Sequence, residues 1–201
     1  MEQSAQITID QVDGEIARLR ALLNGREVRK VNIEGFRPSA VLLPLQIIDG
    51  RPHLLFTQRS GQVENHKYQV SFPGGGADPG ESMLQCALRE THEEIGVPPE
   101  HVQVLGPLDE IFTISSYTVA PFVGVIPHPF EFNLSQIEIA EIFSVSIEHL
   151  LKPEICSVQM HEAPWGNIPI YYYQSDRHTI WGATGRILTQ FLHLAYGKPI
   201  D

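Results

Sequence analysis

The sequence predicts one α+β domain in which helices pack in layers against a mixed β-sheet. Two observations lead to this prediction. The chain has 201 residues, of which 42% are hydrophobic, so it is long enough to bury one sizeable core. Runs of apolar, β-branched residues are interspersed with segments of helical periodicity, and no internal repeat divides them. Residues 1–36 are expected to form an N-terminal helix and lead-in, followed by the main domain at 37–201.

The N-terminal elements are predicted to be a helix and a hairpin. Thr8 to Leu23 carries apolar side chains at helical spacing, which indicates an amphipathic helix packed on the main body. Ser39 to Ile48 is an apolar, β-branched run typical of a buried strand. Asp49-Gly50 is a strong signal for a tight turn, so the next strand, His53 to Gln58, is expected to pair with the first.

A further helix is predicted between two breaks that are rich in glycine and proline. Before it, five such residues mark a loop: Gly74, Gly75, Gly76, Pro79 and Gly80. Ser82 then opens a run without glycine or proline, Met83 to Ile95, and Gly96 with Pro98 and Pro99 ends it. The pattern therefore predicts a glycine-rich loop that leads into a helix.

The second half of the chain is predicted to add strands and two helices. The runs that favour strands are His101–Leu105, Glu110–Ile114, Tyr117–Ile126, Ile137–Val145 and Ile168–Tyr173. A short helix is expected near Ile147–Leu151, and a final helix over Thr179–Ala195.

The helix at 83–95 carries a cluster of acidic side chains on one face. Glu90 and Glu94 are four residues apart and share that face, with Glu93 beside them. Like charges at this spacing destabilise an isolated helix unless a cation neutralises them. Carboxylates suit hard divalent cations such as Mg²⁺ or Mn²⁺. Most acidic clusters are simply solvated, but the adjacent glycine-rich loop favours a metal site here.

The spacing in this region resembles the Nudix box, G-x5-E-x7-R-E-U-x-E-E-x-G-U. The fixed positions are occupied by Gly75, Glu81, Arg89, Glu90, Glu93, Glu94 and Gly96. So many matches arise by chance at roughly 10⁻⁸ to 10⁻⁹ per start position. Thr91 stands where the pattern has an aliphatic residue. The resemblance implies an α/β/α sandwich with a mixed sheet, to which the N-terminal helix is added, and hydrolysis of a nucleoside diphosphate linked to another group.

The resemblance also implies roles for individual residues. Glu90 and Glu94 are the expected metal ligands, with Glu93 next and the carbonyl of Gly74 as a contributor. Arg89 is expected to pair with the box carboxylates and hold them in place, because ligands need such orientation.

Other carboxylates remain open in their roles. Glu81 is expected to support the loop or to bind a second ion. Glu138 or Glu141, which lie beyond the box, is a candidate for the catalytic base or a late ligand, and Glu93 and Arg89 complete the catalytic set.

A second resemblance extends outside the box, over about residues 37 to 192. Coenzyme A pyrophosphatases of the same superfamily carry L-L-T-x-R-S-x3-R-x3-G-x3-F-P-G-G, which is similar to the stretch from Leu54 to Gly75. Two departures from this motif matter for the substrate: Glu64 replaces arginine and Tyr68 replaces glycine. Coenzyme A is therefore one expected substrate, and ADP-ribose, NADH or a nucleotide sugar is the alternative.

Three residues are expected on the substrate side of the site. Arg59 is one, because arginine binds phosphate through a bidentate fork. His66 and Gly75 are the others. The plainer alternatives are a salt bridge at the end of a strand for Arg59 and an ordinary polar loop for His66.

Composition restricts the partners that are expected. The formal net charge of −10 argues against a nucleic-acid coat, because phosphate binding needs concentrated lysine and arginine. The sequence shows no signal peptide and no apolar run long enough to span a bilayer, so a cytoplasmic enzyme without a membrane partner is expected. A homodimer is left open. A noncatalytic Nudix domain that binds a nucleotide as a sensor is the alternative of another class, and loss of box carboxylates would favour it.

Overall fold

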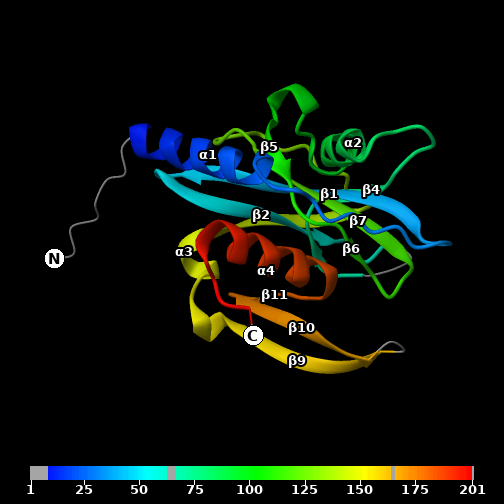
Figure 1. The fold of residues 1–201 in the computed structure, drawn as a ribbon. Coiled ribbons are helices and arrows are strands. Elements are labelled where there is room, and N and C mark those ends of the chain that lie inside the picture. The colour runs from blue at the N-terminus through cyan, green and yellow to red at the C-terminus, as the bar shows by residue number, and fades with distance from the viewer. Residues whose placement is uncertain (1–8, 63–66, 164–165, 201) are drawn as a thin grey trace.

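A computed structural model describes residues 9–62, 67–163 and 166–200 of the chain (Figure 1). Its main feature is an eight-stranded sheet with the central order β3-β2-β1-β7-β5, in which β4 pairs with β1, β6 with β7 and β8 with β2. The strands are β1 (Arg37–Ile48), β2 (Arg51–Arg59), β3 (Val70–Ser71), β4 (Gly74–Gly76), β5 (Gln103–Pro107), β6 (Ile111–Phe112), β7 (Tyr117–Val125) and β8 (Ile139–Ser146). Because β1 runs parallel to β7 and antiparallel to β2 and β4, the sheet is mixed, as predicted.

Strands β1 and β2 form the hairpin that the sequence predicts. Both turn residues have positive φ, 49° for Asp49 and 75° for Gly50, as a type I′ turn requires. The turn places Ile48 opposite Arg51. Strand β1 begins earlier than predicted because its pairing with β7 already starts at Arg37.

The side chains of β1 alternate between two cores, and this alternation creates the layers. Ala40 and Leu42 pack with the inner face of α2, whereas Leu43 and Leu45 pack with α1 and α4. The helices are α1 (Ile9–Asn24), α2 (Met83–Ile95), α3 (Ile147–Leu150) and α4 (Gly182–Tyr196), with short 3₁₀ turns at Pro99–His101 and Pro153–Ile155. In Figure 1, α2 lies above the sheet and α4 beneath it, so the predicted α/β/α sandwich is confirmed.

Helix α2 has the bounds that the sequence predicts because both of its ends carry local signals. At the start, the hydroxyl of Ser82 accepts a hydrogen bond from the backbone N–H of Gln85, and the side chain of Gln85 accepts one from the N–H of Ser82. At the end, Gly96 has a φ of 76° and donates its N–H to the carbonyl of His92. A side chain at Gly96 would also collide with Asn133, whose Cβ would lie 2.8 Å from the added atom.

Helix α1 packs on the same side of the sheet as α4 and contacts its last turn. Leu19 and Leu23 of α1 are fully buried. Gly106 of β5 provides the room for Leu23, since a Cβ at Gly106 would lie 2.7 Å from that of Leu23. The Arg18 Nη1 donates to the carbonyl of Ala195 at 2.8 Å. The predicted start of this helix, Thr8, lies outside the described residues.

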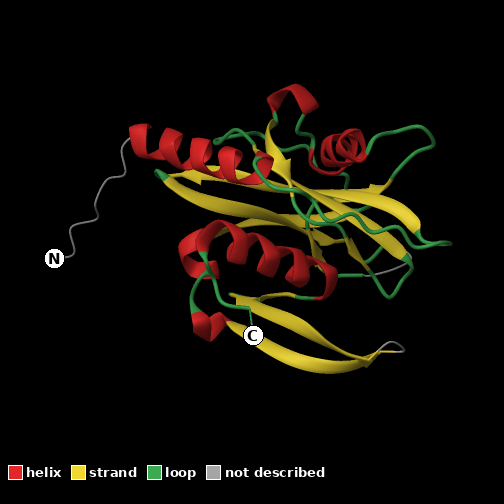
Figure 2. Cartoon of the chain, in the orientation of Figure 1, coloured by secondary structure: helices red, strands yellow, loops and turns green. Residues whose placement is uncertain are grey.

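The C-terminal third differs from the prediction. A three-stranded sheet forms a further layer beyond α4 (Figure 2), built from β9 (Cys156–Ala163), β10 (Gly166–Ser175) and β11 (His178–Ile180). Only part of β10 was predicted. The predicted helix start at Thr179 is wrong, because Thr179 belongs to β11 and pairs with Gln174 of β10. Strand β9 carries mostly exposed, polar residues and therefore has no apolar run by which to recognise it.

Two strands in the middle of the chain are also placed differently. The predicted strand Glu110–Ile114 is reduced to the two residues of β6. His101 belongs to a 3₁₀ turn, and β5 begins at Gln103. None of the helices in the described part of the chain is long and apolar enough to cross a membrane.

The role of Gly96 as the cap of α2 can be tested by alanine substitution, with Gly14 of α1 as the comparison. Gly96→Ala should lower the free energy of unfolding by about 2 kcal/mol, because the residue has a positive φ and abuts Asn133. Gly14→Ala, in open space within α1, should instead raise it by about 1 kcal/mol through helix propensity. Urea unfolding followed by circular dichroism measures both. Equal effects of the two substitutions would contradict the assignment of Gly96 as the helix cap.

Candidate active site

The glycine-rich loop brings main chain into direct contact with α2. Residues 74–76 pair with Ser39–Val41 of β1, which fixes the loop on the sheet. A Cβ at Gly75 would lie 2.5 Å from the Cδ of Glu90, so only glycine lets the Glu90 carboxyl lie against this backbone. At Gly74 a Cβ would meet the carbonyl oxygen of Ala40 at 2.3 Å. The two glycines therefore set the spacing between the loop and the carboxylates.

Arg89 joins three carboxylates and the loop through one guanidinium. Its Nε lies 2.9 Å from Glu81 Oε1, and its Nη1 lies 2.8 Å from Glu90 Oε1 and 3.0 Å from Glu93 Oε2. The Nη2 donates to the carbonyl of Gly76 at 3.0 Å. The bond from Arg89 also lowers the pKa of Glu81. The pairing with Glu93 is the one expected from their helical spacing.

Glu94 is the most deeply buried of the box carboxylates, with only 2% of its surface exposed. Burial raises its pKa to about 8, although the charge of Arg59 and a 3.3 Å hydrogen bond from the Gly74 N–H act in the opposite direction. Burial also raises the pKa of Glu90, against the effect of Arg89. Desolvated carboxylates of this kind are costly unless a positive charge compensates them.

The donor set fits a hard divalent cation. Glu90, Glu93, Glu94 and the carbonyl of Gly74 offer only oxygen atoms, as Mg²⁺ and Mn²⁺ prefer. Within the described residues, no three histidine, cysteine, aspartate or glutamate side chains are gathered tightly enough to hold an ion. Glu90 and Glu93 are each ion-paired with the guanidinium of Arg89.

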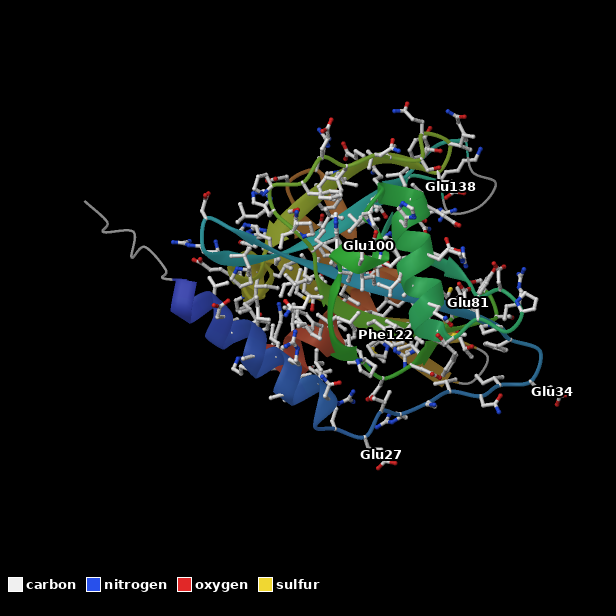
Figure 3. The ribbon with its side chains drawn as sticks, turned by 90° about the horizontal axis from the view of Figure 1, so that it is seen from above. Glu27, Glu34, Glu81, Glu100, Phe122 and Glu138 are labelled. Atoms are coloured by element: carbon white, nitrogen blue, oxygen red, sulfur yellow. The ribbon has the colours of Figure 1, made fainter. Side chains whose placement is uncertain are left out.

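Glu138 comes to this cluster from outside α2. Its charge contributes to the raised pKa of both Glu90 and Glu94. Figure 3 shows Glu81 beside one end of α2 and Glu138 beside the other. The structure therefore places Glu138 near one end of α2, where its charge acts on Glu90 and Glu94.

Glu141 lies apart from the cluster and is engaged elsewhere. Its carboxylate binds Arg177 and His178, and the hydrogen bond from His178 lowers its pKa the most. The His178 ring stacks on Phe143, with centroids 3.8 Å apart. Phe143 packs against the core on the α4 side of the sheet, opposite α2. The two carboxylates that the sequence left as alternatives thus lie in different places: Glu138 near α2, and Glu141 with Arg177 and His178.

The substrate-side candidates are described only in part. Arg59 lies near enough to Glu94 to oppose the rise of its pKa, and its buried Nε has no hydrogen-bond partner within the described residues. No ion pair at the strand end is formed by Arg59 among those residues. Glu64 and His66 lie outside the described residues. Tyr68 is 67% exposed, with a φ of 61°.

Comparison with known proteins agrees with the sequence pattern. The family model of the NUDIX domain matches residues 36–162. A protein of Photorhabdus laumondii named "Uncharacterized Nudix hydrolase NudL" is 37% identical over 155 residues, which cover 77% of this chain and 82% of that protein. A protein of the same name from Citrobacter koseri is 34% identical over 151 residues, covering 75% of each. A crystal structure of a MutT/nudix family protein from Enterococcus faecalis superposes with a TM-score of 0.57 and 15% identity, over 96% of this chain and 75% of that one.

The close approach of Gly75 to Glu90 predicts a sharp difference between neighbouring glycines. Gly75→Ala should weaken Mn²⁺ binding by at least about tenfold, because the added Cβ displaces the Glu90 carboxylate. Gly76→Ala should have a much smaller effect, since a Cβ there meets nothing within 4 Å and the carbonyl of Gly76 remains. Isothermal titration of the metal-free protein with Mn²⁺ compares the two. A similar loss in both variants would show that loop backbone, and not contact with Glu90, governs binding.

Proposed function

The chain belongs to the Nudix hydrolase family, and we propose that it cleaves the diphosphate of a nucleoside diphosphate derivative with Mg²⁺ or Mn²⁺ as its cofactor. The observation that carries this proposal is the burial of Glu90 and Glu94 on α2, which raises the pKa of both, with the segment that carries Glu138 bonded to the last turn of the same helix. Such a cluster is stable as carboxylates only beside a positive charge, and a divalent cation bound to phosphates supplies one.

Several residues would hold the divalent cation, each in a different role. Glu90 and Glu94 would be the main ligands, with Glu93 and the Gly74 carbonyl as further donors. Arg89 would keep Glu90 and Glu93 oriented, as its hydrogen bonds to both carboxylates and to the Gly76 carbonyl support. When bound, the cation screens the charge of the diphosphate and lowers the pKa of the attacking water.

The reaction consumes one water for each anhydride. Water adds to one phosphorus, the bond from that phosphorus to the bridging oxygen breaks, and two phosphate-bearing products leave. Glu138 is the proposed acceptor of the water's proton, because it is exposed and near Glu90 and Glu94. Arg59 is the proposed contact for a phosphate oxygen, through its guanidinium fork. Glu141 has no part in this proposal, since Arg177 and His178 occupy it.

Coenzyme A is the first candidate substrate, and ADP-ribose, NADH or a nucleotide sugar is the second. Tyr68 bears on this choice because it stands where the coenzyme A pyrophosphatase motif has glycine. Its φ of 61° is in the region that glycine favours, so the backbone conformation suits the motif and only the side chain is added. The ring lies beside Gly61, at the surface, and so adds bulk near Ser60 and Arg59. This position supports a difference in substrate choice and not in chemistry.

The alternative of a noncatalytic nucleotide sensor has less support. A domain that binds nucleotides without hydrolysis has no need of the acidic box residues, and all of them are present in this chain. The contacts of Arg89 with Glu81, Glu90 and Glu93 also support catalysis.

The separate positions of Glu138 and Glu141 give a test of the proposed chemistry. Glu138→Gln should lower kcat by about 10² to 10³, because the amide cannot accept the proton. Glu94→Gln should lower turnover by at least as much through loss of a ligand. Glu141→Gln should change kcat less than about twofold, because its partners are Arg177 and His178. Steady-state kinetics with circular dichroism as a check on folding measures all three. If Glu141→Gln is the inactive variant, the base has been misplaced.

The substrate is tested by Mg²⁺-dependent turnover of a matched panel, with products identified by mass. The panel holds coenzyme A, ADP-ribose, NADH, UDP-glucose and a nucleoside triphosphate. We expect cleavage at a diphosphate, and we expect EDTA to abolish it. Preference for coenzyme A would mean that Glu64 and Tyr68 are tolerated variations of the motif. Preference for another member in the wild type, reversed by Tyr68→Gly, would assign the altered specificity to that side chain. Bound nucleotide without turnover would favour the sensor.

A further inference from the structure

The segment that carries Glu138 lies between two apolar residues that pack in the interior, Leu134 and Ile139, and hydrogen bonds to its main chain hold the exposed residues between them. Residues 136–138 are exposed, and Ile137 has 69% of its surface accessible, so apolar packing does little to fix their position. On one side, the N–H of Ser135 donates to the carbonyl of Glu94 at 2.9 Å, which attaches the segment to the last turn of α2. The carbonyl of Ser135 then accepts from the N–H of Glu138 at 2.9 Å.

On the other side, a single buried residue attaches the segment to the end of β2. The hydroxyl of Ser60 donates to the carbonyl of Ile137. The N–H of Ser60 donates to the carbonyl of Glu138 at 2.7 Å. Its hydroxyl oxygen also accepts the N–H of Gln62 at 3.1 Å. Ser60 is only 5% exposed, so these bonds are shielded from competing water.

The position of Ser60 follows from an irregularity in the sheet. The register between β2 and β8 shifts between Gln58 and Arg59, so that Gln58 faces Glu141 whereas Arg59 faces Ile139. Irregularities of this kind interrupt the regular ladder and re-aim side chains beside functional sites. After the irregularity, the hydrogen bonds from Ser60 to the carbonyls of Ile137 and Glu138 connect the end of β2 to the segment before β8.

We propose that Ser60 is a positioning residue that holds Glu138 beside the carboxylates of α2, an inference that rests on the proposed role of Glu138 as proton acceptor. Ser60 acts through the backbone and touches neither the reacting phosphorus nor the water. Because Ser135 attaches the same segment to α2, the two serines fix it from both sides, and the hydroxyl of Ser60 is the side-chain part of that connection.

The test is a double-mutant cycle between Ser60→Ala and Glu138→Gln. Ser60→Ala should lower kcat by about tenfold and leave KM within about twofold, because the base is displaced but substrate contacts remain. In the Glu138→Gln background, Ser60→Ala should cost nothing further, since the residue acts only through Glu138. An equal loss of kcat in both backgrounds, or a loss confined to KM, would overturn the proposal.

A second measurement does not depend on activity. In the metal-free protein, hydrogen exchange of the amides at 135–139 should be at least about tenfold faster in Ser60→Ala than in wild type. Thr189→Val is the matched control: it removes another buried hydroxyl that donates to a main-chain carbonyl, that of Gly185 in α4. This control should leave both kcat and exchange at 135–139 as in wild type.

The two measurements separate failure of the inference from failure of the proposed function. Full activity of Glu138→Gln would overturn the role of Glu138 as proton acceptor, and with it the positioning role of Ser60, even if exchange at 135–139 increased as expected. Unchanged exchange in Ser60→Ala would overturn the connection itself, whatever the outcome for Glu138.

Discussion

The accumulation of negative charge along α2 is the constraint on which the rest of the site depends. Glu81, Glu90 and Glu93 converge on one guanidinium, and Glu94, in the last turn of the same helix, is almost fully buried. In water such a group repels itself and remains solvated. Here one guanidinium, that of Arg89, meets three of the carboxylates, while Glu94 accepts one long hydrogen bond from the Gly74 N–H and is influenced by the more distant charge of Arg59. Burial raises the pKa of Glu94 and Glu90, and these two are the proposed main ligands of the cation.

The surrounding fold keeps this arrangement in place by close backbone contacts. Gly75 allows the loop to lie against Glu90, and Gly96 lets the chain turn sharply after the helix. The chain that follows returns to the end of the helix, where Ser135 bonds to the carbonyl of Glu94. The acidic helix is therefore contacted by the glycine-rich loop at Gly75 and by the chain at 133–135.

The parts of this structure that the sequence predicts are those with local signals. Ser82 and Gly96 mark the ends of α2 by their own hydrogen bonds, and Asp49-Gly50 determines the hairpin turn. Strand β9 had no such signal, because an exposed edge strand is defined by its partner β10 and not by its own pattern. The choice between Glu138 and Glu141 was equally hidden. It depends on Arg177 and His178, which reach Glu141 only through the folded sheet. Ser60 was visible in a motif, but its bonds to the chain at 137–138 were not.

The packing of α1 shows where the folding unit of this protein begins. The match to the NUDIX domain family starts at residue 36. Leu19 and Leu23 nevertheless lie in the same core as α4, and Gly106 leaves room for Leu23. The carbonyl of Ala195, in the last turn of α4, receives its side-chain donor from Arg18. A chain shortened to the family boundary would retain every acidic residue discussed above while losing one wall of its interior. The residues proposed for catalysis therefore all follow residue 36, whereas residues that stabilise the fold already lie in α1.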